Sequence, residues 1–191
     1  FNENIDLNNW ETNFYTSPPL KTSFKTDIKK SNLILTIPDN INEETTYCLS
    51  FDNCIKDVNE GNVISDLKYI FSTSNVIDTL TINGEIVDSY SLVPESKIWV
   101  LLYDISIPDS LVFKSPPLYI TKTNIAGEFC FPNLPNKKYL IYAISGDDFQ
   151  LNDITKKIGL YKETVIGGIS KNITLYLFNS KPDTIFEDSL L

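Results

Sequence analysis

Hydrophobic and polar residues alternate along much of this chain, which is the pattern of β-strands with one buried face. Leu33, Leu35 and Ile37, for example, recur with the required period of two. No stripe with the 3.6-residue period of a helix runs long enough to predict a major helix. A single helical turn is expected at residues 6–10, with Asp6 as its N-cap.

The strands that this pattern predicts fall into two groups. In the first half of the chain we expect strands at residues 13–17, 20–27, 32–37, 45–51 and 64–72. In the second half we expect them at residues 79–87, 97–104, 118–123, 128–131, 138–144 and 172–178. Because no helices alternate with these strands, the predicted fold class is all-β, with two tandem antiparallel β-sandwiches.

We therefore divide the chain into domains at 1–74 and 75–178, followed by a polar, mobile tail at 179–191. The first domain has about five predicted strands, whereas an immunoglobulin-like sandwich uses about seven, so we expect it to be truncated at its N-terminus. The chain starts at Phe1, contains no Met and shows no signal peptide. We interpret it as an internal fragment of a longer protein.

The junction between the two domains is short and partly apolar. Val76, Ile77 and Leu80 stand where a flexible linker would have Gly or Ser. Apolar side chains in a linker are stable in water only if they are buried. The sequence therefore predicts that these side chains pack between the domains and fix one domain against the other.

Composition excludes several classes of function. The net charge is −9, and all 16 basic residues are Lys, which disfavours nucleic acid because Arg reads phosphates and guanine edges. The chain has no His, so Ser-His and Cys-His nucleophile pairs and histidine zinc sites are excluded. No apolar run approaches the ~20 residues of a membrane helix. An enzyme would have to use carboxylates, Tyr or Lys, and we expect none.

The three cysteines do not form a paired disulfide framework, because their number is odd. Alternation places Tyr47, Leu49 and Phe51 on one face of a strand and Cys48 on the other. Ordinary thiols on strands are one interpretation of Cys48, Cys54 and Cys130, and a disulfide between Cys48 and Cys54 is another.

Several stretches of the chain resemble a known pair of domains. In the first half they are Thr45-Thr46-Tyr47, Phe51, residues 55–62 and 69–73, and the junction Asp78-Thr79-Leu80. They resemble an S-layer-type bacterial Ig-like domain found in Bacteroidota lipoproteins. In the second half they are Gly84, residues 100–103, Tyr119, residues 121–123 and 127–129, Leu134, Tyr139 and residues 142–143. These residues resemble a carboxypeptidase-regulatory or prealbumin-like sandwich.

The resemblance implies a non-catalytic lipoprotein of the cell envelope, in the outer membrane, facing either the periplasm or the cell surface. Its partners would be other envelope proteins or further domains of the same chain. Its only contact with a membrane would be a lipid attached upstream of Phe1. Neither nucleic acid nor a cofactor is implied.

Two acidic loops offer the oxygen ligands that Ca²⁺ prefers. Asp57, Asn59, Glu60 and Asn62 surround Gly61, and a second acidic run occupies residues 147–153. The spacing in the first loop is not that of an EF-hand. The alternative is an ordinary hairpin loop, in which Asp57 and Asn59 bond their own backbone and Gly61 takes a positive φ.

Aromatic residues and Asp-Ser/Thr-aliphatic tripeptides supply the remaining candidates. The aromatics could form a sugar-binding platform or fill the core: Trp10, Trp99, Tyr103, Tyr119, Tyr139, Tyr142 and Tyr161. Tyr47 could form a tyrosine corner with the backbone. Exported Bacteroidota proteins can carry O-glycans within such tripeptides, so the resemblance makes four residues glycosylation candidates: Thr79, Ser110, Thr184 and Ser189. Ordinary turn chemistry is the alternative.

Together these observations favour a rigid spacer or protein-interaction module of an envelope protein. The alternative is an accessory module that binds carbohydrate or Ca²⁺.

Overall fold

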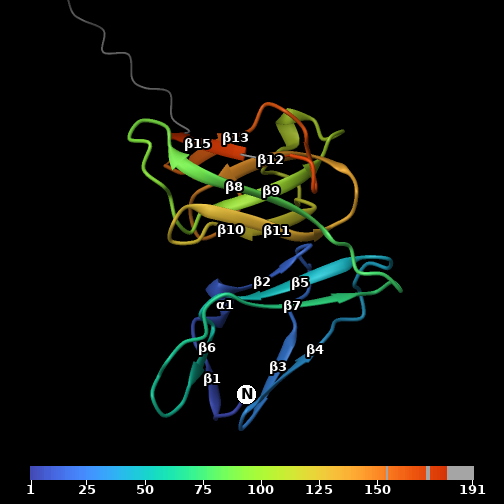
Figure 1. Ribbon diagram of the computed structural model, residues 1–191, viewed down its shortest axis with the longest axis vertical. Coiled ribbons are helices and arrows are strands. Elements are labelled where there is room, and N and C mark those ends of the chain that lie inside the picture. Colours follow the sequence, from blue (N-terminus) through green and yellow to red (C-terminus); the bar gives the residue numbers. More distant parts are fainter. Residues whose placement is uncertain (154, 171–172, 180–191) are drawn as a thin grey trace, which may run out of the picture.

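The computed structural model describes residues 1–153, 155–170 and 173–179. Within these residues the regular secondary structure is almost entirely β-strand, arranged as two modules stacked along the long axis of the molecule (Figure 1). The N-terminal module contains strands β1 to β7, and the C-terminal module contains β8 to β15. The predicted all-β fold class is therefore confirmed.

The N-terminal module has seven strands and one short helix. They are β1 (Ile5–Leu7), α1 (Trp10–Asn13), β2 (Phe14–Ser17), β3 (Lys25–Lys29), β4 (Asn32–Thr36), β5 (Thr46–Phe51), β6 (Ile55–Asp57) and β7 (Leu67–Ser72). The sequence-based count of five strands was wrong, because β1 and β6 are three-residue strands in which alternation is too short to detect. The predicted helical turn was also wrong, because Asp6 lies in β1 and the helix begins at Trp10 with Asn9 as its N-cap.

Three small antiparallel sheets form this module. They pair β1 with β6, β3 with β4, and β2 with β5 and β7, with β5 in the centre. Leu49, Phe51 and Ile55 lead its core, and Phe24 is buried there although it precedes β3. In Figure 1 the pairs β1–β6 and β3–β4 extend from the sheet β2–β5–β7 away from the C-terminal module.

Tyr47 joins the start of β5 to the loop before it. Its side chain is fully buried and its ring stacks on Phe71, with 5.4 Å between the ring centroids. Its Oη accepts a hydrogen bond of 2.9 Å from the backbone N–H of Asn42, five residues upstream. This is the predicted tyrosine corner, which is therefore confirmed.

The C-terminal module is a single, strongly curved sheet. Its elements are β8 (Leu80–Asp88), β9 (Trp99–Asp104), η1 (Asp109–Leu111), β10 (Tyr119–Lys122), β11 (Glu128–Leu134), β12 (Lys138–Ile144), β13 (Lys157–Leu160), β14 (Val165–Ile166) and β15 (Ile173–Asn179). The strand order is β10-β9-β12-β13-β15-β8-β11, and β14 pairs with β12. β15 therefore includes Asn179, the first residue of the predicted tail, and residues 180–191 lie outside the described residues.

The two edge strands of this sheet, β10 and β11, approach each other and nearly close it into a barrel. The Thr121 hydroxyl on β10 donates a 3.1 Å hydrogen bond to the Cys130 carbonyl on β11. All strand pairs are antiparallel except β8 and β15, which are parallel. Leucine, isoleucine and phenylalanine side chains fill the interior, including Ile82, Phe131 and Leu175.

A second apolar cluster lies on the outer face of β9 and β12. Trp99, Leu101 and Tyr103 alternate along β9 and are buried in this cluster, so both faces of the strand are covered. Tyr15 of the N-terminal module packs against the same cluster. The modules therefore share apolar packing in addition to the chain that connects them.

Candidate functional site at the module interface

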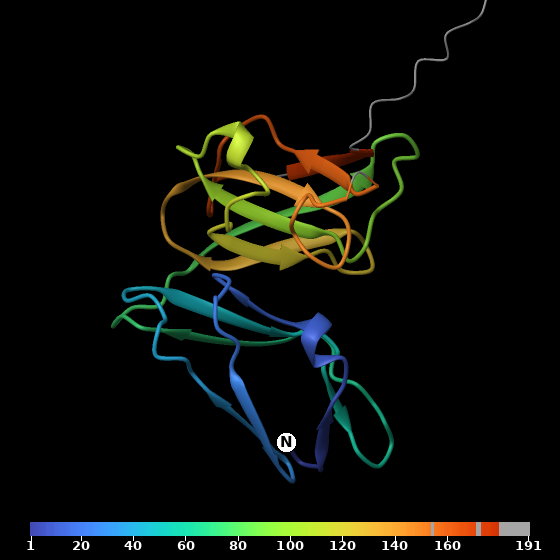
Figure 2. The same cartoon turned by 180° about the vertical axis from the view of Figure 1, so that it is seen from behind.

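The sheet β2–β5–β7 lies directly against the edge strands β10 and β11 of the C-terminal module, as both views show (Figures 1 and 2). Leu49 and Phe51 of β5 point into the core of their own module. Thr46, Cys48 and Ser50 alternate with them and are 2%, 4% and 5% exposed. These three residues are buried because β5 packs on β11, where Cα atoms of the two strands come within 8 Å of each other.

Hydrogen bonds connect the two modules directly. The Ser17 hydroxyl, at the end of β2, accepts a 3.1 Å hydrogen bond from the backbone N–H of Ile120 on β10. The Lys122 ammonium group donates a 3.0 Å hydrogen bond to the backbone carbonyl of Thr12. The Ser17 hydroxyl thus bonds a backbone N–H group on the edge of β10 that does not pair with β9, which would otherwise be free to pair with another strand.

Asp78 fixes the chain where it passes from one module to the other. Its carboxylate accepts a 2.8 Å hydrogen bond from the Thr46 hydroxyl, and its backbone N–H donates a 3.0 Å hydrogen bond to the Thr46 hydroxyl oxygen. The Asn133 side chain, at the end of β11, donates a 2.7 Å hydrogen bond to the Asp78 carbonyl. One residue therefore contacts both modules.

The aromatic part of the interface centres on Trp99. Tyr15 meets it edge-to-face with 5.3 Å between ring centroids, and the Lys122 ammonium lies 4.1 Å above its ring. Loss of hydration at this site lowers the pKa of Lys122, while the carboxylates of Asp52 and Asp147 oppose that change. A lysine placed over an indole and bonded to a carbonyl is a structural contact rather than a free nucleophile.

The prediction that the apolar junction side chains are buried between the modules was wrong. Val76 is 72% exposed and Ile77 is 46% exposed. Only Leu80 packs, half-buried, against the core of the C-terminal module. The hydrogen bonds between Thr46 and Asp78 fix the path of the junction. On this path the side chains of Val76 and Ile77 are exposed to water.

A cleft of about 500 Å³ opens beside these contacts. The N-terminal module contributes charged residues to its wall, and the C-terminal module contributes mainly amide, hydroxyl and thiol groups. The polar lining residues are Ser50, Asp52, Asp66, Lys68, Asn83, Thr121, Lys122, Thr123, Asn124, Glu128 and Cys130. Both signs of charge are present, so the cleft does not select for an anion or a cation on charge alone.

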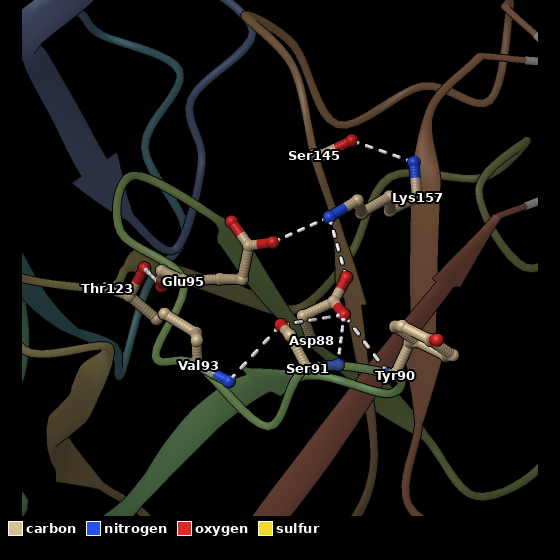
Figure 3. A network of polar contacts seen from close by, with 8 residues as sticks. All are labelled: Asp88, Tyr90, Ser91, Val93, Glu95, Thr123, Ser145 and Lys157. Atoms are coloured by element: carbon tan, nitrogen blue, oxygen red, sulfur yellow. Dashed lines mark hydrogen bonds and ion pairs between the residues drawn. The ribbon is translucent and has the colours of Figure 1, made fainter.

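A separate polar network holds the loop between β8 and β9 (Figure 3). The Lys157 ammonium contacts Asp88 at 2.8 Å and Glu95 at 2.6 Å. Asp88 also accepts hydrogen bonds from the backbone N–H groups of Tyr90 and Ser91. Lys157 and these donors hold the pKa of Asp88 well below its usual range. The network gives the loop a defined shape, and sequence reasoning missed it because its members lie far apart in the chain.

The loop that holds the metal candidates Asp57, Asn59, Glu60 and Asn62 has the geometry of a hairpin loop. The Asp57 carboxylate accepts a hydrogen bond from the backbone N–H of Glu60, and Gly61 has a φ of 74°. The Asn62 amide donates to the Glu60 carboxylate at 2.7 Å, and Asn59 is exposed. Backbone N–H groups, that of Glu60 foremost, lower the pKa of Asp57. The neighbouring carboxylate of Asp57 raises the pKa of Glu3.

In the second acidic loop, a lysine already neutralises the central carboxylate. Lys156 lies 2.5 Å from Asp148, and Lys156 together with the Gln150 backbone N–H lowers the Asp148 pKa. Asp153 accepts a 2.8 Å hydrogen bond from the backbone of Thr155. Across the described residues, no group of three or more His, Cys, Asp or Glu side chains is arranged to hold a metal ion.

The candidate sugar platform does not form a single exposed surface. Trp99, Tyr103 and Tyr139 are buried in the C-terminal module, and Tyr119 and Tyr161 are partly buried against its core. Tyr142 is partly buried on the outer cluster. Trp10, in the other module, stacks on Phe14 with 4.1 Å between ring centroids and contributes to the core there.

All three cysteines are free thiols. The interpretation with a Cys48–Cys54 disulfide was wrong, because the two side chains point to opposite sides of β5. Cys54 is buried in the core of the N-terminal module, whereas Cys48 lies on the opposite face of β5, at the interface. Burial raises the pKa of Cys54 to about 11.

Two of the glycosylation candidates are accessible. Thr79 is exposed at the junction, and Ser110 is exposed in η1. Thr184 and Ser189 lie outside the described residues. Attachment of a glycan at any of the four stays a prediction.

Residues 1–73 match the family model of the bacterial Ig-like domain, a segment that contains β1 to β7. Such domains are typically extracellular or surface-associated and are generally non-enzymatic. No curated protein matches the chain. The prealbumin-like character of the second module, the Bacteroidota origin and the lipoprotein status stay predictions. Within the part of the chain that the structure describes, no helix is both long and apolar enough to cross a membrane.

Proposed function

We propose that this chain is a non-catalytic, rigid two-module spacer that positions a partner or a further domain within a protein of the cell envelope. The observation that carries the proposal is the direct bonding between the modules, above all the hydrogen bond from Ile120 to Ser17 and the packing of Tyr15 on Trp99. A flexible tandem would expose Thr46, Cys48 and Ser50 to water. Here they are buried against the second module.

The positions of Phe1 and of β15, the last described strand, support a spacer. Phe1 lies at the end of the N-terminal module that faces away from the interface, and β15 lies at the opposite end of the long axis (Figure 1). The fixed interface sets the orientation of one module relative to the other, and with it the distance between these two ends. A spacer of this kind keeps two attached parts at a defined distance, which a flexible linker cannot do.

The Ig-like family of residues 1–73 supports a location outside the cytoplasm. We place the protein in the cell envelope, with other envelope proteins or further domains of the same chain as partners. Membrane attachment would then come from a lipid upstream of Phe1. The unpaired edges of β7, β3 and β4 could bind such partners, because each of these strands pairs on only one side within its sheet.

Small-angle scattering tests the proposal. Ser17→Arg puts a long charged side chain at a residue that is only 8% exposed, and it should force the modules apart. Thr26→Arg, on an exposed position of β3, is the matched control. Wild type and Thr26→Arg should share one compact distance distribution, and Ser17→Arg should give a broad one. A broad, multi-conformer profile for the wild type would refute the spacer proposal.

A second candidate function follows from the cleft, whose size falls in the range of about 300–1,000 Å³ that small-molecule sites occupy. Its hydroxyl, amide and carboxylate groups match the hydrogen-bonding groups of a carbohydrate. Titration with soluble oligosaccharides, followed by NMR shifts at Asn83 and Lys68, tests it. Unchanged shifts at millimolar sugar would dismiss it.

A further inference from the structure

Two of the three cysteines face each other across the module interface. Cys48 lies on the face of β5 that the C-terminal module buries. On β11, Phe129 and Phe131 point into the barrel core, so Cys130 between them points outward, toward β5. The thiols of Cys48 and Cys130 thus both point into the space between β5 and β11.

Hydrogen bonds on both sides of the thiols fix how β5 and β11 are aligned. Ser17 is the register partner of Cys48 in the β2–β5 pair, and its hydroxyl bonds Ile120 of β10. The next residue of β10, Thr121, bonds the carbonyl of Cys130. Two side-chain hydrogen bonds therefore connect the surroundings of Cys48 with Cys130. The bond between Ser17 and Ile120 joins the modules, and the bond between Thr121 and Cys130 lies within the barrel.

The ends of the two strands show the same alignment. Thr46, two residues before Cys48, is joined through Asp78 to Asn133, three residues after Cys130. Ser50, two residues after Cys48, lines the cleft together with Cys130. The Lys68 ammonium acts on the pKa of both thiols, and Cys130 acts on that of Cys48, as close neighbours do. Cys48 therefore lies opposite Cys130.

We propose that Cys48 and Cys130 form a redox modification site that links the two modules by a disulfide. The oxidant is a disulfide, either a small one such as oxidised glutathione or that of a thiol–disulfide exchange protein. Some Cα atoms of β5 and β11 lie within 8 Å of each other, and a disulfide needs roughly 4.4–6.8 Å between the Cα atoms of its two cysteines, so the bond requires the strands to be at this close approach at Cys48 and Cys130.

The cleft determines the order of the reaction. Cys130 lines the cleft and is partly exposed, whereas Cys48 is 4% exposed. The Cys130 thiolate attacks the incoming disulfide, whose S–S bond breaks and releases one thiolate. The Cys48 thiolate then attacks the Cys130 sulfur and releases the second thiolate. Two protein thiols are oxidised, one external disulfide is reduced to two thiols, and the two protons pass from the protein to the released thiolates.

The consequence is a covalent bond between the modules, which deepens the proposed spacer function and rests on it. Burial raises the pKa of both thiols, and Lys68 opposes that rise. Reduced protein relies on the hydrogen bonds and the apolar packing of the interface, without a covalent bond between the two cysteines. Oxidised protein keeps the two modules together even when those bonds break.

The experiment uses a Cys54→Ala background, so that Cys48 and Cys130 are the only thiols. The protein is incubated with oxidised and reduced glutathione, and its mass and aspartate-cleaved peptides are analysed. We expect a monomer that has lost two hydrogens, with the Cys48 and Cys130 peptides joined. Its melting temperature should rise by roughly 5–15 °C. Added Cys48→Ala or Cys130→Ala should abolish that rise.

Protein that carries only glutathione adducts, forms only intermolecular dimers, or stays reduced while urea-unfolded protein reacts, would overturn the proposal. Rigidity is measured separately by scattering on Cys48→Ala/Cys130→Ala, which cannot form the disulfide. A rigid variant together with failed cross-linking refutes the redox site alone. A flexible variant refutes the spacer function.

Discussion

Replacement of Tyr15 by alanine should remove an aromatic contact that the N-terminal module makes with its neighbour. Tyr15 is half-buried, and its ring meets Trp99 edge-to-face at 5.3 Å. Full burial of a large apolar side chain gives about 1.5–3 kcal/mol, of which a half-buried ring gains about half. The aromatic pair adds about 0.5–1.5 kcal/mol. We therefore expect Tyr15→Ala to lower the free energy of unfolding by about 2 kcal/mol.

A double-mutant cycle assigns this loss to the contact between modules. Urea unfolding is measured for Tyr15→Ala, Trp99→Leu and the combined variant. If the rings touch in solution, the two losses are not additive, and the coupling should be about 0.5–1.5 kcal/mol. Tyr69→Ala is the matched control, because Tyr69 lies on β7 of the same module and is 60% exposed.

The control should be additive with Trp99→Leu, within about 0.3–0.5 kcal/mol. If Tyr15→Ala is additive to the same degree, the two rings do not meet in solution and the reasoning fails. A loss well below 1 kcal/mol for Tyr15→Ala alone would contradict the estimated size of the contact.

Four further predictions follow. Tyr47→Phe should cost about 1 kcal/mol in urea unfolding, because the Asn42 N–H loses its acceptor; an unchanged midpoint would contradict this. Ile77→Asp should leave the scattering profile unchanged, because the side chain is already 46% exposed; a broadened profile would show that the junction packs. The folded state holds the pKa of Asp88 below its ordinary value of 3.8, so the ionised carboxylate stabilises the fold at pH values above 3.8. This stabilisation is lost as the pH falls below 3.8. Asp88→Asn should therefore flatten the fall of melting temperature between pH 5 and pH 2, and an identical pH profile would refute the role of Lys157. Millimolar Ca²⁺ should leave the melting temperature within about 1 °C, whereas a micromolar site would add about 4 kcal/mol.

Much of the fold can be predicted from local pattern alone. The alternation in residues 138–144 reproduces β12 to the residue, and β4 and β5 are predicted to within one residue at each end. Tyr47 is recognisable as a corner residue because it is a tyrosine in a strand that adjoins a long loop. These elements have one face in a core, so their own sequence carries the signal.

The interface is not predictable in this way, because its residues are ordinary in their local context. Ser17 is a small polar residue beside Pro18, and its role depends on Ile120, more than a hundred positions away. The apolar character of Val76 and Ile77 pointed to burial, but hydrogen bonds between Thr46 and Asp78 set the path of the chain. Contacts between modules depend on tertiary placement, which alternation does not record.

The central claim is that the two modules are fixed against each other, and ¹⁵N NMR relaxation tests it most directly. Amides of β5 report on the first module, and amides of β12 report on the second. If the interface holds, both sets fit one anisotropic diffusion tensor, with the tumbling time of a single 21.7 kDa particle. Two separate tensors, each with the shorter tumbling time of one module, would contradict the account.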